Sequence, residues 1–269
     1  MKNIINEVIS NLKSEKDGYC RIKHKKGWLG FLKDGDLVFK PRELHQVLRQ
    51  VIDSEDKRPR GSKLFFLRER YNFTVTSKKK PYRTEEALER FITASNPANF
   101  FNQIPIGGRK ESIDIGIKEN ESRFVFIELK PWSSTNSPLY AIVESLKNLI
   151  EYRIIAEKKI TEIEKFEEVD LVVLAPQSYY QRYGLIDSAE DKISIVKKAL
   201  NDLSSEFDTN ISLMILPINK EAFFDICRRV CGKYKKTTGQ ESIAISSADR
   251  IPELERDKWK LLVAADKDS

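Results

Sequence analysis

Residues 112–132 read SIDIGIKENESRFVFIELKPW, and they decide how the centre of the chain folds. Two apolar runs, 112–118 and 123–130, flank a short polar segment, a pattern typical of two strands joined in a hairpin. Opposed residues in a symmetric hairpin have position numbers with a constant sum. A turn centred on Glu121 therefore places Asp114 opposite Glu128, with Cβ atoms about 4.5–5.5 Å apart.

The charged residues of this hairpin predict a metal site. Strand alternation turns Asp114 away from the direction of Ile113 and Ile115. Glu128 and Lys130 share one face. Two opposed carboxylates repel each other, and a cation between them removes the repulsion; hard oxygen ligands suit Mg²⁺ or Mn²⁺. Lys130 would position or deprotonate a water, or neutralise charge on a phosphate. Alternatively, Glu128 and Lys130 form a solvated strand end, with Asp114 at a sheet edge.

Helical and strand patterns alternate around the hairpin. The apolar spacing predicts helices over 41–52, 84–95, 137–158, 188–207 and 219–230, and further strands over 169–175 and 211–217. This alternation favours an α/β fold, with a central mixed β-sheet flanked by helices on both faces. The pattern after Gly232 is weak, and the role of residues 176–269 stays open.

An acidic residue on one strand followed by Glu-x-Lys on the next resembles the core of the PD-(D/E)XK nuclease superfamily, the restriction-endonuclease-like phosphodiesterases. The matching residues are Ile113-Asp114 and Glu128-Leu129-Lys130, with Ile113 where the family often has Pro. The resemblance covers about residues 84–175 and implies a restriction-endonuclease-like core. It also implies Mg²⁺ or Mn²⁺ held by Asp114, Glu128 and the Leu129 carbonyl, with Lys130 assisting the attacking water.

The two neighbouring helices supply further candidates. In the segment TEEALERFI, residues 84–92, helical angles place Glu85 closest to the apolar side, Glu89 next, and Glu86 pointing away. The family resemblance implies that such an acid, Glu85 first and Glu89 second, binds a second metal or orients a water. The helix PLYAIVESLKNLIEY resembles that of the RecB-like branch, which has Gln near its start. Glu144 occupies that position, with Lys147 one turn later, and both are secondary candidates.

Positive charge is concentrated in residues 1–83, which hold 21 Lys and Arg against 10 Asp and Glu. Residues 84–269 hold 26 against 31, so the chain's net charge of +6 belongs to its first third. We expect a basic N-terminal α+β accessory region, 1–83, followed by a nuclease-like domain, 84–269. The candidate nucleic-acid-binding residues of the accessory region are Lys57, Arg58, Arg60, Lys63, Arg68, Arg70, Lys78, Lys79, Lys80 and Arg83. The aromatic residues among them either stack on bases or pack inside a hairpin, and we favour packing.

Composition excludes several other classes of protein. Hydrophobic residues make up 40% and charged residues 33%, which is typical of a globular chain, and no apolar run approaches the length of a spanning helix. Three cysteines are too few for a disulfide framework, and no other Cys or His pair completes a zinc site with Cys227 and Cys231. We therefore expect a cytoplasmic protein with reduced thiols.

The leading hypothesis is a metal-dependent nuclease, in particular a DNA endonuclease of restriction, defence or repair type, with Mg²⁺ or Mn²⁺ as cofactor and DNA as partner. A homodimer or a larger defence or repair complex is compatible with it. One alternative is a catalytically silent recognition protein that keeps the nuclease fold and binds nucleic acid. Another is an RNA-processing nuclease. A cluster after the predicted strand over 169–175, Tyr179, Tyr180, Arg182 and Tyr183, either contacts nucleic acid or, as we favour, packs as a loop.

Overall fold

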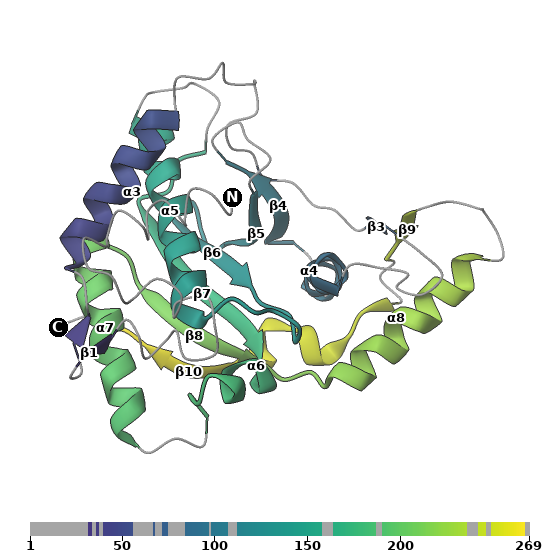
Figure 1. Ribbon diagram of the computed structural model, residues 1–269. Coiled ribbons are helices and arrows are strands. Elements are labelled where there is room, and N and C mark those ends of the chain that lie inside the picture. Colours follow the sequence, from purple (N-terminus) through teal and green to yellow (C-terminus); the bar gives the residue numbers. More distant parts are fainter. Residues whose placement is uncertain are drawn as a thin grey trace.

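The computed structural model shows one central sheet with helices on both of its faces (Figure 1). The described residues are 32–33, 36–37, 40–55, 67, 72–74, 84–96, 98–106, 112–157, 164–186, 190–235, 242–245 and 249–266. The ten basic residues of 57–83 that were predicted to bind nucleic acid lie outside them.

The central sheet has six strands in the order β10-β8-β7-β6-β5-β4. Their bounds are β4 Phe100–Pro105, β5 Ser112–Lys118, β6 Arg123–Leu129, β7 Glu168–Pro176, β8 Ile211–Leu216 and β10 Lys260–Ala264. β7 pairs in parallel with both β6 and β8. The pairs β4–β5, β5–β6 and β8–β10 are antiparallel. The sheet is therefore mixed, as the sequence pattern predicted.

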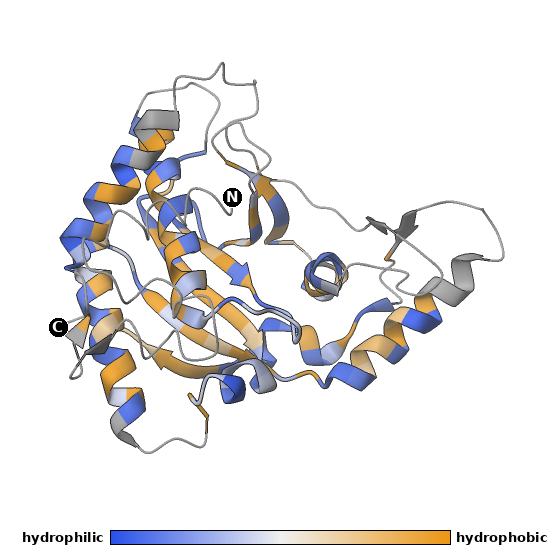
Figure 2. Ribbon diagram, in the orientation of Figure 1, coloured by the Kyte–Doolittle hydropathy of each residue, from blue (hydrophilic) through white to orange (hydrophobic). Residues whose placement is uncertain are grey.

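The helices divide into two groups, one on each face of the sheet. One core joins the sheet to α3 (Pro41–Glu55), α5 (Pro138–Glu157), α6 (Gln177–Arg182) and α7 (Glu190–Phe207). The other joins it to α4 (Thr84–Ser95), α8 (Lys220–Lys235) and the 3-10 turn η3 (Pro252–Leu254). A second 3-10 turn, η4 (Arg256–Lys258), follows η3 and has no buried residue. Figure 2 shows hydrophobic residues along the strands, and both hydrophobic and hydrophilic residues along the helices, as expected for a sheet covered on both faces by helices with one buried side.

The region before residue 84 contributes to the first of these cores, which contains α3, α5, α6 and α7. Leu44, Leu48 and Ile52 of α3 are buried in the same cluster as residues of α5 and α7. Two short antiparallel pairs complete the described part: β1 (Leu32–Lys33) with β2 (Asp36–Leu37), which are close in sequence, and β3 (Asn72–Thr74) with β9 (Ser242–Ala244), which are far apart in sequence. Segments that we assigned to an accessory region thus pack against, or pair with, the main domain.

The elements predicted around residues 84–217 are confirmed, with shifted ends. The helix over 84–95 and the strand over 112–118 have the predicted bounds, but α3 continues to Glu55 and α8 to Lys235. The sequence pattern missed β4, α6 and β10. Among the described helices, none is long and apolar enough to cross a membrane.

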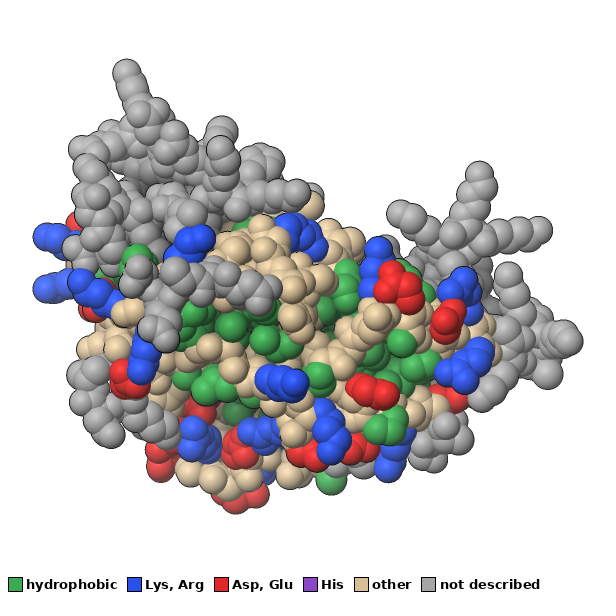
Figure 3. Space-filling model, turned by 90° about the horizontal axis from the view of Figure 1, so that it is seen from below, with side chains coloured by type: hydrophobic (Ala, Val, Ile, Leu, Met, Phe, Trp, Pro, Cys, Tyr) green, Lys and Arg blue, Asp and Glu red, His purple; other side chains and the backbone are tan. Residues whose placement is uncertain are grey.

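On the face seen in Figure 3, Lys and Arg lie beside Asp and Glu along the lower and right-hand parts of the described area, whereas hydrophobic and uncharged groups dominate the middle. Among the residues that the structure describes, Leu261 on β10 is a large hydrophobic residue with high exposure, at 62%. The described residues of this face do not form a patch of one charge.

Gly116 leaves space for the aromatic side chains that pack on β5. A Cβ at this position would lie 2.4 Å from Ile104 Cδ1 and 2.5 Å from Phe124 Cζ, both inside the core. We expect Gly116→Ala to lower the free energy of unfolding by about 1–3 kcal/mol, because overpacking forces its neighbours to shift. Denaturant titration measures the loss. Gly184→Asn, at a left-handed position (φ +68°) where a Cβ would meet only the end of the Lys192 side chain at 3.7 Å, should cost less than Gly116→Ala, because Asn tolerates this backbone region better than most residues do. Equal unfolding curves for wild type and Gly116→Ala would contradict the packing argument.

Candidate functional site

A cavity of about 150 Å³ lies where the strands β5 and β6 meet the helices α4 and α5. Lys130 directly follows β6, and its backbone N–H donates to the Leu174 carbonyl of β7 at 3.0 Å, which fixes the end of the strand. The cavity is lined by Glu85, Ser112, Asp114, Glu128, Lys130, Ser134, Asn136, Glu144, Lys147 and Asn148. It therefore gathers six of the eight residues predicted for catalysis or metal binding, whereas Glu89 and Leu129 are not part of its lining.

The hairpin has the register that the sequence predicted. Ile115 pairs with Ile127 and Gly116 with Phe126, so the position numbers of partners have the constant sum that sets Asp114 beside Glu128. Asp114 Oδ2 also accepts a hydrogen bond of 2.8 Å from the backbone N–H of Leu129. The Asp114 carboxylate is thereby fixed against the end of β6.

One expectation about this hairpin is wrong. Ile113 and Ile115 were predicted to share a face opposite Asp114, but they belong to different cores. Ile115 packs with α4, whereas Ile113 packs with α5. The side chains of the strand therefore switch from one face of the sheet to the other at Asp114, which lies at the boundary between the two cores. This position lets the residue approach both β6 and the acids of α4.

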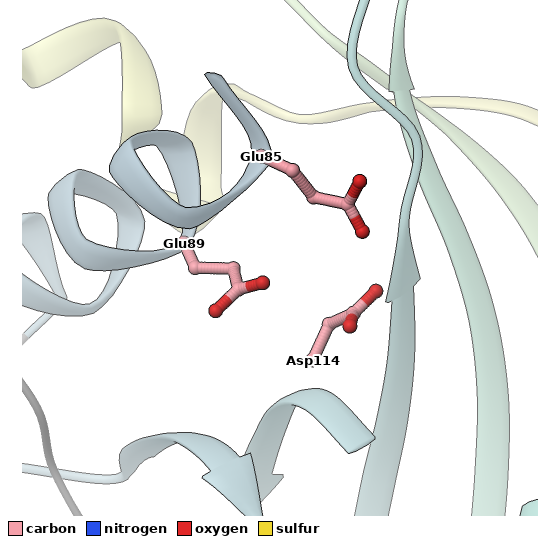
Figure 4. A group of neighbouring side chains, drawn as sticks. All are labelled: Glu85, Glu89 and Asp114. Carbon is pink, nitrogen blue, oxygen red and sulfur yellow. The ribbon is translucent and has the colours of Figure 1, made fainter. Parts of the chain in front are cut away.

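Three carboxylates from two elements converge at this boundary. Oxygen atoms of Glu85, Glu89 and Asp114 all lie within 4.8 Å of one another. Figure 4 shows Glu85 and Glu89 projecting from α4 toward Asp114. Glu89 is 2% exposed and Asp114 9%, whereas Glu85 is an exposed residue whose carboxylate turns toward the cluster.

The order of burial on α4 is the reverse of the prediction from helical angles, which ranked Glu85 ahead of Glu89. Glu89 is buried because it has two partners that a helical wheel does not reveal. Arg90 Nη1 donates to Glu89 Oε2 at 3.1 Å, and Gln103 Nε2 of β4 donates to the same oxygen at 2.7 Å. Arg90 also lies 3.8 Å from Glu86.

Crowding and burial favour the neutral forms of these acids. Burial, followed by the charges of Glu89 and Glu85, raises the pKa of Asp114 well above its ordinary value. Burial likewise raises the pKa of Glu89 to about 8, although Arg90 and Gln103 act in the opposite direction. The pKa of Glu85 is raised by the loss of hydration, with Lys130 opposing that rise. A cation is the group that would relieve this repulsion, so the donor set fits a hard divalent ion.

Lys130 forms the second part of the site, a buried ion triad. Its ammonium is 2.7 Å from Glu144 Oε2 of α5 and also donates to Glu128 Oε1. Burial alone would lower the pKa of Lys130, but Glu128, Glu144 and Asp114 outweigh it and raise that pKa well above its ordinary value. Lys130 therefore stays protonated. The pKa of Glu128 is also raised, by burial and by Asp114.

A further buried ion pair lies on the α5 wall of the cavity. Lys147 Nζ donates to Glu151 Oε2 at 3.0 Å, and the two residues are 1% and 3% exposed. Lys147 was a secondary candidate from the sequence. Glu151 was missed, and the signal that could have found it is its position four residues after Lys147 on one helix.

The cluster Tyr179, Tyr180, Arg182 and Tyr183 packs against the loop between β6 and α5, but it belongs to the helix α6 and the residue after it and not to a loop as we expected. Tyr179 Oη donates to the Asn136 carbonyl at 2.8 Å, and Tyr183 Oη to the same carbonyl at 3.0 Å. Arg182 Nη1 donates to the Ser134 carbonyl at 2.7 Å. Ser134 and Asn136 line the cavity, so the cluster holds part of the cavity wall in place.

The structure thus separates the predicted site residues into two adjoining groups. Glu85, Glu89 and Asp114 form the set that can hold a cation. Glu128 lies next to Asp114 but is bonded to Lys130, together with Glu144. Leu129 contacts the site through its backbone N–H, which donates a hydrogen bond to Asp114.

Comparison with protein-family models, with curated proteins and with solved structures gives no match to this chain. The class that the described fold and site define is an α/β protein with a mixed six-stranded sheet and a buried acidic cluster beside a lysine.

The metal-free protein should lose stability as the pH rises from about 4.5 to about 8. In this window the folded state holds a proton on Glu89 that the unfolded chain, with the ordinary pKa of 4.5, has released. Stability from this group is fully present below pH 4.5 and is lost through about pH 8, on the order of a few kcal/mol. Urea titrations with a chelator across this range measure the decline.

Glu89→Gln should flatten this decline, and so should saturating Mg²⁺ in the wild type, because a cation favours the charged carboxylates. The matched control is Glu253→Gln, an exposed position on η3, which should keep the wild-type profile. A Glu89→Gln profile as steep as that of the wild type would show that other groups cause the decline.

Proposed function

We propose that this chain is a metal-dependent nuclease of the PD-(D/E)XK superfamily that hydrolyses phosphodiester bonds, in particular a DNA endonuclease of restriction, defence or repair type. One observation carries the proposal. The Asp and the Glu-x-Lys that resemble the family motif line one cavity together with Glu85 of the preceding helix, and Glu89 of the same helix lies beside Asp114. A solvated strand end would not bury Asp114, Glu128 and Lys130 there.

The arrangement of the sheet supports the same assignment. Asp114 and Glu128 lie on adjacent antiparallel strands, and β6 then pairs in parallel with β7. A mixed sheet with helices on both faces is what a restriction-endonuclease-like core requires. We infer that β4–β7 with α4 and α5 form that core.

The cation would be held by Glu85, Glu89 and Asp114, whose oxygens are hard ligands that suit Mg²⁺ or Mn²⁺. When bound, the ion supplies Lewis-acid chemistry at a phosphoryl oxygen. Glu128 adjoins this set through Asp114 and joins it to the lysine.

Lys130 would act by its charge. Its raised pKa keeps the ammonium protonated, so it is suited to neutralise negative charge that develops on the phosphate and to orient a water by donation. The same raised pKa disfavours Lys130 as the base that deprotonates the water. Glu128 and Glu144, which hold the ammonium on two sides, restrict its direction.

The substrate class that we propose is inferred mainly from the amino-acid sequence. The basic residues between Lys57 and Arg83 would bind the phosphate backbone, and the net charge of residues 1–83 favours a polyanion. Within the described residues the cavity itself supplies neutral donors, Ser134, Asn136 and Asn148, on the side that adjoins the loop and α5. These groups suit contacts with a sugar or a phosphate rather than with an apolar ligand.

The test is a cleavage assay on supercoiled plasmid, linear duplex, single-stranded DNA and RNA, each with Mg²⁺, with Mn²⁺ and with a chelator. We expect nicked or linear plasmid with either ion and none with chelator. Asp114→Asn is the inactive reference, and Asp202→Asn, an exposed position on α7, is the matched control. Cleavage of RNA alone would support the RNA-processing alternative.

Two outcomes would contradict the proposal. Cleavage that persists in Asp114→Asn would point to a contaminant or another site. A wild type that cleaves no form, yet binds DNA in a salt-sensitive way that Asp114→Asn leaves unchanged, would favour the silent recognition protein.

A further inference from the structure

Gln103 occupies a distinctive position beside the acidic cluster. On β4, Asn102 pairs with Ile115 and Ile104 with Ile113, which places Gln103 between them, directly opposite Asp114. Gln103 is also one of three described non-glycine residues with a positive φ, at +51°. Side chains with a Cβ adopt this left-handed region at an energetic cost, and such positions cluster at functional sites.

The strained backbone coincides with a change in the facing of β4. Phe100 packs in the core on the α4 side, whereas Ile104, four residues later, packs in the core on the α5 side. Residues four apart on a regular strand share a face. The side chains of β5 also switch faces of the sheet at Asp114. The alternation of both strands is therefore interrupted at the same place, the Gln103–Asp114 pair.

The irregular backbone of β4 at Gln103 directs two successive side chains to the same helix. Asn102 Nδ2 donates to Thr93 Oγ1 of α4 at 2.8 Å, and Gln103 Nε2 donates to Glu89 Oε2 of α4 at 2.7 Å. Neighbouring residues of a regular strand point to opposite faces, so both contacts cannot form without the irregular backbone. The left-handed φ is therefore what brings the Gln103 amide to Glu89.

The contact restricts how Glu89 presents its carboxylate. Gln103 and Arg90, from different elements, both donate to Oε2. Two donors on one oxygen fix the rotation of the group and give its two oxygens different roles. Hydrogen bonds of this kind to ligating carboxylates are known to tune metal sites.

We propose that Gln103 is a positioning residue, which orients the Glu89 carboxylate so that Oε1 is presented to the divalent cation. Gln103 itself does not touch the ion or the substrate. The inference rests on the proposed function for the role of the cation, but it concerns metal binding and is tested without cleavage.

The experiment measures the affinity of the full-length, metal-free protein for Mn²⁺ by calorimetry. Glu89→Gln is the reference that removes a ligand. Gln103→Met keeps the length of the side chain without its donors, and we expect it to weaken Mn²⁺ binding by about 10-fold. Gln50→Met, on the exposed face of α3, is the matched control and should bind as the wild type does.

A second variant separates the hydrogen bond from the backbone. Gln103→Gly adopts a positive φ without strain and also lacks the amide, so it should fold yet show the same weakened binding. Thermal unfolding with chelator checks that each variant is folded. A purely structural role would change the unfolding temperature and leave Mn²⁺ affinity as it is.

Each outcome is decisive. Wild-type affinity in both Gln103 variants, with binding lost in Glu89→Gln, overturns the positioning role while leaving the metal site intact. A wild type that binds no Mn²⁺ overturns it as well. Mn²⁺ binding that is weakened as expected, in a protein that cleaves no nucleic acid, supports Gln103 and contradicts the proposed nuclease.

Discussion

Asp114→Asn should abolish metal-dependent cleavage and stabilise the metal-free protein at high pH. Asn keeps an oxygen that can accept the Leu129 N–H but removes the charge that Asp114 offers to a cation. If the cation contributes about 4 kcal/mol to the transition state, the rate falls by about 1000-fold. Single-turnover cleavage of a labelled duplex in Mn²⁺ measures this.

The stability of the same variant gives an independent test. At pH 9, above the pKa of about 8 for Glu89, an acid at position 114 costs stability, because burial and the charges of Glu89 and Glu85 raise its pKa well above the ordinary value, and Asn removes that cost. We expect the free energy of unfolding to rise by about 1 kcal/mol. A gain of this size is usual when a substitution removes a residue that serves function at the expense of stability. Asp202→Asn should change neither property. A less stable and inactive Asp114→Asn would indicate a structural residue.

Lys130→Met should lower both activity and stability, the latter by about 3–5 kcal/mol. Lys130 is 5% exposed and is bonded to two buried carboxylates. Without the ammonium, Glu128 and Glu144 would remain buried and unneutralised. Urea denaturation at pH 7 measures the loss, and Lys192→Met, on the exposed side of α7, is the control.

A double variant distinguishes the two effects of Lys130. Lys130→Met combined with Glu144→Gln removes one of the uncompensated charges, so it should recover part of the stability without recovering cleavage. Recovery of cleavage in the double variant would mean that Lys130 matters only for folding. Retained activity in the single variant would remove Lys130 from the proposed chemistry.

The hairpin could be predicted because its determinants are local. The polar turn is closed by Asn120, whose side chain accepts from the N–H groups of Ser122 and Arg123 at 2.8 and 2.9 Å. These contacts span three residues, and the apolar alternation on either side leaves one workable register. The expected neighbours Asp114 and Glu128 follow directly from it.

The missed strands have non-local causes. In β4, Asn102 and Gln103 interrupt the apolar alternation because both bond to α4, and that reason is visible only in three dimensions. β10 is an edge strand with exposed residues, and its partner β8 lies more than 40 residues earlier. The burial of Glu89 likewise depends on a partner from another element.

The loop between β6 and α5 has its carbonyl groups bonded by Arg182, Tyr179 and Tyr183 in the folded protein. Ordering a backbone residue costs about 1–2 kcal/mol of conformational entropy, and here that cost falls on folding rather than on ligand binding. A substrate that reaches Ser134 and Asn136 meets a preorganised wall. Loosening that wall should therefore appear first as weaker binding, with the rate of the bound complex changed less.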